Sequence, residues 1–124
     1  MDAEDFVSVS VRVEAFPAAQ ASLRAAMQRF IDSLREALRR RGGVRVGHIK
    51  GMVEDGESPP LFFSLTSLDA EAGLKGGPLK EGAWVVLSVT AIVAGIDRDE
   101  LSRLLRVCLG GHFLPAPGER RASP

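Results

Sequence analysis

The stretch Val7-Ser8-Val9-Ser10-Val11-Arg12-Val13, "VSVSVRV", decides the fold class. It lies within residues 6–16, where valines at odd positions alternate with polar side chains at even positions. Successive side chains of a β-strand point to opposite faces, so this alternation predicts a half-buried strand with one apolar face. Pro17 ends the pattern. Because an apolar sheet face must be buried against another layer, the segments that follow should supply its cover.

The period changes to that of a helix over residues 18–41. Apolar residues recur there at spacings of three and four, which predicts an amphipathic helix with one buried stripe. Three arginines precede Gly42-Gly43 at its end, as expected for the last turn and the cap of a helix. The stripe consists of Leu23, Met27, Phe30, Leu34 and Leu38.

Three further strands are predicted over residues 44–54, 61–67 and 84–96, and a short helix after Asp97. Asp97 has the character of an N-cap residue, with Glu100 three positions later. The last strand would span roughly 40 Å at about 3.3 Å per residue, which is long for a small sheet. We therefore expect it to project beyond its sheet, to bend sharply or to pair with another chain.

The resulting order, β-α-β-β-β-α, predicts an α+β two-layer sandwich. Its sheet would be four-stranded and mostly antiparallel, with two helices on one face. This arrangement resembles the ferredoxin-like fold, except that the helix between the third and fourth strands is missing or reduced to a turn. We expect residues 1–111 to form a single α+β domain and residues 112–124 to form a Pro-rich C-terminal tail that is at least partly disordered.

Composition narrows the functional classes. The 124 residues carry no formal net charge, so no overall field favours nucleic acid or a membrane surface. The N-terminus is acidic and the longest apolar run, residues 83–96, is too short to span a bilayer. The single cysteine, Cys108, and two histidines are too few for a conventional zinc site. A cytoplasmic protein without metal, cofactor or membrane contact is expected.

The segment Gly47-His48-Ile49-Lys50-Gly51 holds the most reactive pair of side chains. If Ile49 and Val53 face the helices, His48 and Lys50 point to the other face of the sheet. The same register places small hydroxyl side chains beside them, and such a flat face suits a ligand or another protein surface better than bulk water. These hydroxyl residues are Ser64, Thr66, Ser88 and Thr90.

Three functions are compatible with these features. The favoured one is an accessory domain, without catalysis of its own, that forms a homo-oligomer or binds a protein partner. The first alternative is a small enzyme with a site between subunits, in which His48 acts as acid or base. Lys50 or Lys75 would then hold an anionic substrate, and the residues Lys75, Gly76, Gly77 and Lys80 form a possible anion-binding loop.

The second alternative is weak nucleic-acid binding through the basic end of the first helix. The arginines that would contact phosphates are Arg35, Arg39, Arg40, Arg41 and Arg45. Nucleic acid is disfavoured as a partner because aromatic residues suited to base stacking are few. An enzyme requires His48 in a pocket with a polar partner, whereas an interaction domain requires the hydroxyl-bearing face to be covered.

Overall fold

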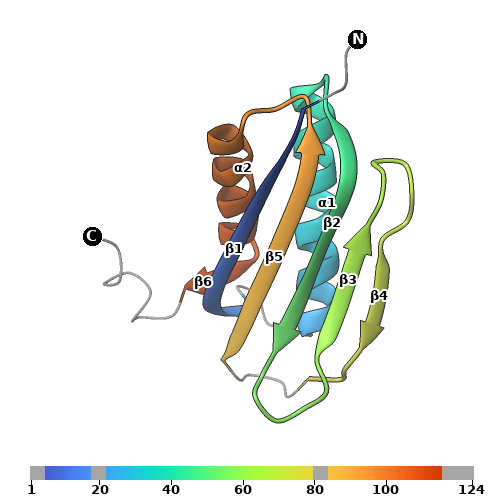
Figure 1. The fold of residues 1–124 in the computed structure, drawn as a ribbon. Helices are drawn as coiled ribbons and strands as arrows, with labels where there is room; N and C mark the ends of the chain where they lie inside the picture. The colour runs from blue at the N-terminus through green and yellow to red at the C-terminus, as the bar shows by residue number, and fades with distance from the viewer. Residues whose placement is uncertain (1–4, 18–21, 80–83, 116–124) are drawn as a thin grey trace.

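The computed structural model describes residues 5–17, 22–79 and 84–115. Their helices and strands follow one another along the chain as shown in Figure 1. In order they are β1 (Phe6–Pro17), α1 (Leu23–Arg41), β2 (Arg45–Glu54), β3 (Leu61–Leu65), β4 (Gly73–Gly76), β5 (Val85–Ala94), α2 (Arg98–Gly110) and β6 (Phe113–Pro115).

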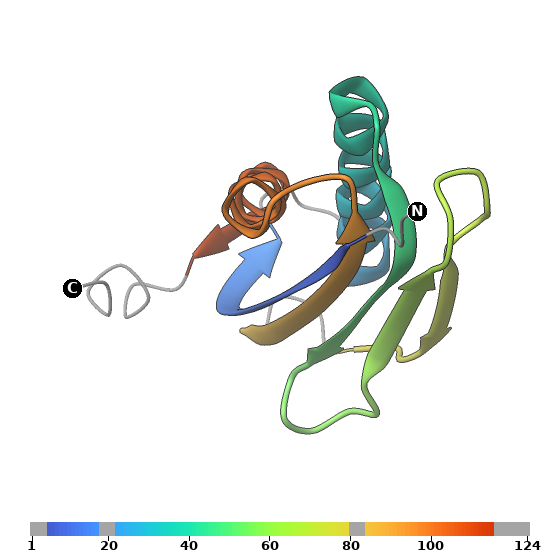
Figure 2. The ribbon, with the colours of Figure 1, turned by 45° about the horizontal axis from the view of Figure 1, so that its top comes forward.

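The six strands form one sheet in the order β4-β3-β2-β5-β1-β6, in which every neighbouring pair is antiparallel. β1 and β2 both pair with β5, so they run parallel to each other with β5 between them and α1 as their connection. The sheet is twisted and curls into a half-barrel (Figure 2).

The prediction of a four-stranded sheet with two helices on one face, a ferredoxin-like variant, is wrong, although the α+β class holds. Two edge strands were missed. β4 lies inside the expected connection of residues 68–82 and pairs with β3, and β6 lies in the expected tail and pairs with β1. Neither is long enough to show the alternation that marks a half-buried strand: β4 has four residues, none of them buried, and β6 has three, of which Phe113 is buried. Residues 116–124 of the expected tail lie outside the described residues.

α1 begins at Leu23 because Ser22 caps it: the Ser22 hydroxyl accepts a hydrogen bond from the Ala25 amide at 3.0 Å. Its apolar stripe lies against the sheet. Phe30 and Leu34 are 0% and 1% exposed, as the spacing predicted, and the Phe30 ring meets the Phe63 ring edge-on at 6.1 Å. The helix side of the sheet is therefore the core.

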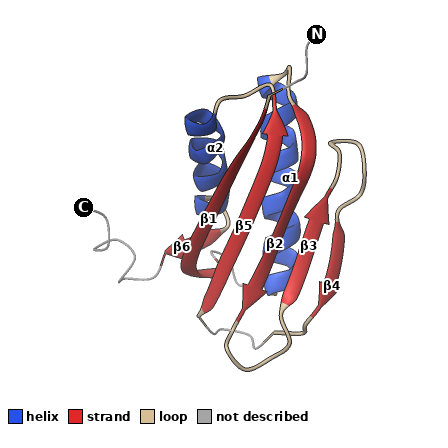
Figure 3. Ribbon diagram, viewed as in Figure 1, coloured by secondary structure: helices blue, strands red, loops and turns tan. Residues whose placement is uncertain are grey.

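α2 begins after Asp97, whose carboxylate accepts a hydrogen bond from the Glu100 amide at 2.9 Å, which confirms the predicted N-cap. The helix contacts β1 and α1, near the β6 edge of the sheet (Figure 3). The Arg41 guanidinium donates from Nε and Nη2 to the two carboxylate oxygens of Glu100, at 2.7 and 3.1 Å, and so joins the end of α1 to the start of α2. This hydrogen bond also raises the pKa of Arg41.

Of the three alternatives for the long strand, projection beyond its sheet is wrong, whereas pairing with another chain stays a prediction. β5 contains ten residues, and β1 and β2 accompany it along nearly its whole length. Its neighbours are as long as it is, so all of β5 is accommodated at the centre of one sheet.

A β-bulge in β2 sets the direction of the site residues. The register with β5 shifts between Val46 and His48, leaving Gly47 as the extra residue. A Cβ atom on Gly47 would lie 3.0 Å from the Phe6 ring, which explains the glycine. Without the bulge, Val46 and Ile49 could not both point into the core, where they are 8% and 0% exposed.

Candidate functional site

One face of the sheet points away from α1, and we call it the open face. It consists of the side chains that alternate with the buried ones along each strand. Its members are Phe6, Ser8, Ser10, Arg12, Glu14 and Phe16 of β1, Arg45, His48, Lys50, Met52 and Glu54 of β2, Phe62 and Ser64 of β3, Gly73 and Lys75 of β4, Val86, Ser88, Thr90 and Ile92 of β5, Leu114 of β6, and Trp84, which directly precedes β5 and stacks on Phe16.

His48 and Lys50 lie on this face, as their register predicted. Lys50 pairs with Ser64 of β3 on one side and with Thr90 of β5 on the other. Side chains of directly paired residues lie about 5 Å apart at Cβ, so both hydroxyls are immediate neighbours of the lysine. The Thr90 hydroxyl is also hydrogen-bonded to that of Ser10, at 2.9 Å.

A depression of about 510 Å³ lies over β2, β3 and β5 at this point. His48 and Lys50 line it together with the hydroxyl residues Ser64, Ser88 and Thr90, and Met52 and Phe62 supply apolar walls. The structure thus brings together five of the predicted site residues. Thr66 is exposed just beyond β3 and does not line the depression. Within the described residues, the side chains of His48 and Lys50 have no hydrogen-bond or ion-pair partner.

The open face also carries most of the exposed apolar surface. Six large apolar side chains are exposed among the described residues, and the open face holds five of them, whereas Val107 lies on α2. Trp84 precedes β5 and stacks on Phe16 with ring centroids 3.9 Å apart. The sequence reasoning noted the small hydroxyl residues but missed this apolar component. The five are Phe6, Phe62, Trp84, Ile92 and Leu114.

Known proteins share this fold but not this sequence. No protein-family description matches the chain, and no curated protein matches it either. Two crystal structures of zinc(II)-bound YjiA GTPase, one from E. coli and one a triple mutant, align with TM-scores of 0.50 and 0.51 at 18% sequence identity. Each alignment covers 86% of this chain and 29% of the GTPase chain, so this chain corresponds to less than a third of that protein. At this identity the likeness concerns the fold alone.

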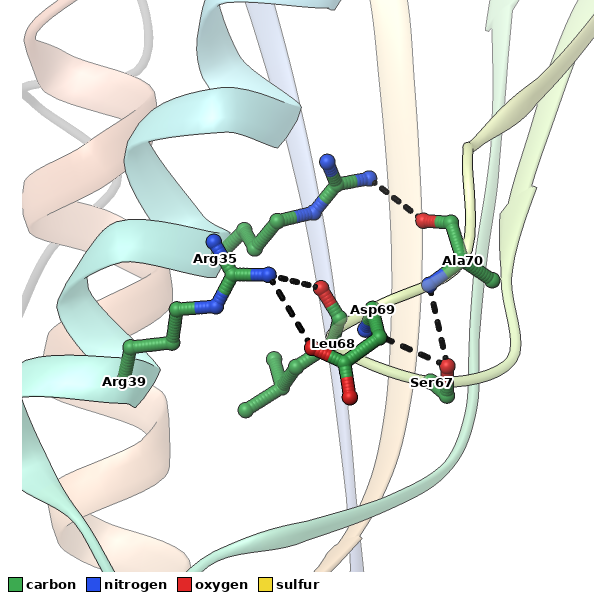
Figure 4. Close-up of polar contacts among 6 residues, drawn as sticks. All are labelled: Arg35, Arg39, Ser67, Leu68, Asp69 and Ala70. Atoms are coloured by element: carbon green, nitrogen blue, oxygen red, sulfur yellow. Dashed lines mark hydrogen bonds and ion pairs between the residues drawn. The ribbon is translucent and has the colours of Figure 1, made fainter.

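The basic residues at the end of α1 are occupied by contacts within the chain. Figure 4 shows Arg35 and Arg39 reaching the turn after β3, where they donate to the carbonyl oxygens of Ala70 at 2.9 Å and Leu68 at 2.6 Å. Arg39 also pairs with Asp69 at 3.3 Å, and the Ser67 hydroxyl accepts from the backbone amides of the same turn.

The other arginines of the run are engaged as well. Arg40 lies 3.8 Å from Glu36, Arg41 binds Glu100, and the Arg45 guanidinium lies 5.6 Å from the centre of the Phe6 ring. Arg35 and Arg39 fasten the turn to α1, and Arg41 joins α1 to α2. Arg40 remains 74% exposed at its side chain, and nucleic-acid binding through this basic end stays a prediction.

The backbone of the possible anion-binding loop is held by contacts within the chain. Lys75 and Gly76 belong to β4, and the Gly77 amide donates to the Pro60 carbonyl at 3.3 Å. Gly76 has a φ of +102°, and a Cβ atom there would lie 2.1 Å from the Pro60 oxygen, so the backbone itself requires glycine. Lys80 lies outside the described residues. These contacts leave anion binding by the loop a prediction without support.

A second cavity, about 970 Å³ in volume, lies between α1 and α2. The Ser33 hydroxyl and the His112 ring are 2.7 Å apart at one part of its wall, and no sequence pattern connects these two residues, which are 79 positions apart. Cys108 also lines it but is only 8% exposed, and burial raises the pKa of its thiol. We interpret the Ser33–His112 contact as a tie between α1 and the segment after α2.

The described parts of the chain contain no group of three or more histidine, cysteine or carboxylate side chains that could hold a metal ion. In the same parts, neither helix is long and apolar enough to cross a membrane.

Proposed function

We propose that this chain is a cytoplasmic accessory domain that associates with a second copy of itself through the open face. The observation that carries the proposal is the gathering of five of the six exposed large apolar side chains on that face. Exposed apolar patches mark contact sites, and this face has one at each end of β5, with Ile92 near Phe6 and Trp84 stacked on Phe16. The small side chains of Ser88, Thr90 and Ser64 between them would allow a flat surface to approach closely.

Two neighbouring rows of the open face have complementary charges, within a face that carries four cationic residues and two carboxylates in all. Arg12 shares a row across the sheet with Ser88 and Met52, and the next row holds Glu14 and Glu54 around Val86. A twofold axis that crosses the strands between these rows would set the cationic row of each copy against the carboxylate row of the other. A like-charged face would instead repel its copy.

Catalysis is supported less well. An acid or base role for His48 requires a hydrogen-bonding group that orients the ring and sets its proton. The described residues provide His48 with a depression but with no such partner, and Lys75 lies outside that depression. The enzyme alternative remains a prediction.

The proposal is tested by placing a charge in the apolar part of the face. Phe62→Glu should shift the protein from an associated to a monomeric elution volume in size-exclusion chromatography, while circular dichroism shows that it remains folded. Val107→Glu is the matched control, because Val107 is also an exposed apolar residue, 74% exposed, but lies on α2. If both variants associate as the wild type does, or if Val107→Glu alone dissociates it, the open face is not the contact.

A further inference from the structure

The depression on the open face has the composition of a site for a small organic anion. Its lining combines one ammonium group, one imidazole and three hydroxyls, and it contains no carboxylate. Ammonium and hydroxyl groups donate hydrogen bonds to anionic oxygens, and a neutral imidazole can donate one as well. The volume of about 510 Å³ is within the range of about 300–1,000 Å³ typical of sites for small molecules.

The donors converge because of the strand register. Lys50 stands between Ser64 and Thr90, and His48 lies two residues along β2 on the same side. The carboxylates of the face stand apart: Glu54 is four residues from Lys50 along β2, and Glu14 pairs with Val86 at the same level as Glu54. An anion at Lys50 would therefore meet donors at close range without a neighbouring negative charge.

The remaining wall is apolar. Phe62, 48% exposed, and Met52 pair with each other across β3 and β2 beside the donor cluster. An exposed aromatic ring flanked by a methionine offers a surface for a flat apolar group. The lining is therefore divided into a cationic, hydroxyl-rich part and an apolar part.

We propose that this depression binds a small molecule that carries a phosphate or carboxylate group on a flat apolar body. The anionic group lies against Lys50, His48 and the hydroxyls of Ser64 and Thr90, and the apolar body lies against Phe62 and Met52. All the groups come from a single chain, and the second copy proposed above would cover the same residues, so the ligand and the second copy compete for this surface.

The test titrates the labelled protein with three probes and monitors its amide chemical shifts. Phenyl phosphate and benzoate are the anionic probes, and benzyl alcohol is the neutral one. Both anions, or one of them, should cause saturable shifts in residues 48–52, 62–64 and 88–90. Binding of phenyl phosphate alone identifies a phosphate site, and binding of benzoate alone a carboxylate site. Equal binding of the neutral alcohol, or no saturable shift with any probe, overturns the proposal.

Two lysine variants locate the contact. Lys50→Gln should weaken the anionic probe at least about tenfold, which corresponds to about 1.4 kcal/mol. Lys75→Gln, two strands away on β4 and outside the lining, should leave the affinity unchanged. Equal effects of the two variants would show only a general charge attraction and would overturn the site. Sedimentation of the same samples reports self-association separately, so failure of the ligand site and failure of the proposed function are distinguishable.

Discussion

At the scale of single residues, Gly51 shows how closely β2 and β3 approach. A Cβ atom on Gly51 would lie 2.2 Å from Cε2 of Phe63 and 2.8 Å from the Ser88 carbonyl oxygen. The Phe63 ring thus occupies the space that a side chain would need, on the buried side of the depression. Gly51→Ala should lower the free energy of unfolding by about 1–3 kcal/mol, the usual cost of overpacking.

Gly73→Ala is the control for this prediction. Gly73 also lies in a strand, but its added Cβ would have only Ser64 Oγ nearby, at 3.8 Å. Chemical denaturation should place Gly73→Ala at or slightly above the wild-type midpoint and Gly51→Ala clearly below it. Equal midpoints for the two variants would contradict the close packing of Phe63.

Cys108 should be an unreactive thiol. Burial raises its pKa, an effect that the nearby charge of Arg40 opposes only in part, so the thiolate fraction near neutral pH is smaller than in an unfolded chain. Alkylation by iodoacetamide should be slower in the folded than in the denatured protein, and its rise with pH should be displaced to higher pH. Equal alkylation rates in the two states would show that the thiol is accessible.

At the scale of elements, α1 contributes seven buried apolar side chains to the core. Leu34 is 1% exposed, in the middle of the stripe that covers the sheet. Leu34→Ala should cost about 2–5 kcal/mol of stability, measured by denaturant titration, because it leaves a cavity in a packed core. A midpoint equal to the wild type's would contradict the packing of α1 on the sheet.

The elements also show which parts of the fold the sequence could predict. β1, α1 and β5 could be predicted because each buries one face or stripe. Such burial makes apolar residues recur with a period of 2 in a strand and 3.6 in a helix. β4 and β6 have no such requirement: Gly73–Gly76 is held by its pairing with β3, and Phe113–Pro115 by its pairing with β1. Pairing at the edge of a sheet requires no particular residue pattern, so the predicted sheet lacked these two strands.

The candidate site could also be predicted only in part. His48, Lys50, Ser64, Ser88 and Thr90 could be placed together from alternation, because one register decides the face of all of them. The roles of the arginines could not, since the carbonyl oxygens of Leu68 and Ala70 that hold Arg39 and Arg35 come from a turn about 30 positions away in the chain. Contacts to distant backbone atoms leave no pattern in the sequence.

At the scale of the whole molecule, the two faces of the sheet differ in burial. One is buried under α1 in a continuous apolar core, and the other presents aromatic and aliphatic side chains around a patch of hydroxyls and Lys50. We propose that a second copy of the chain covers this open face.

Sedimentation velocity over a concentration series tests that claim most directly, with the wild type compared with Ser88→Arg. Ser88 lies at the centre of the face, and an arginine there would hold a second copy away without touching the core. The account predicts a wild-type sedimentation coefficient that rises with concentration to that of a dimer, and a folded Ser88→Arg variant that stays monomeric. A wild type that remains monomeric throughout, or a variant that associates equally well, would contradict it.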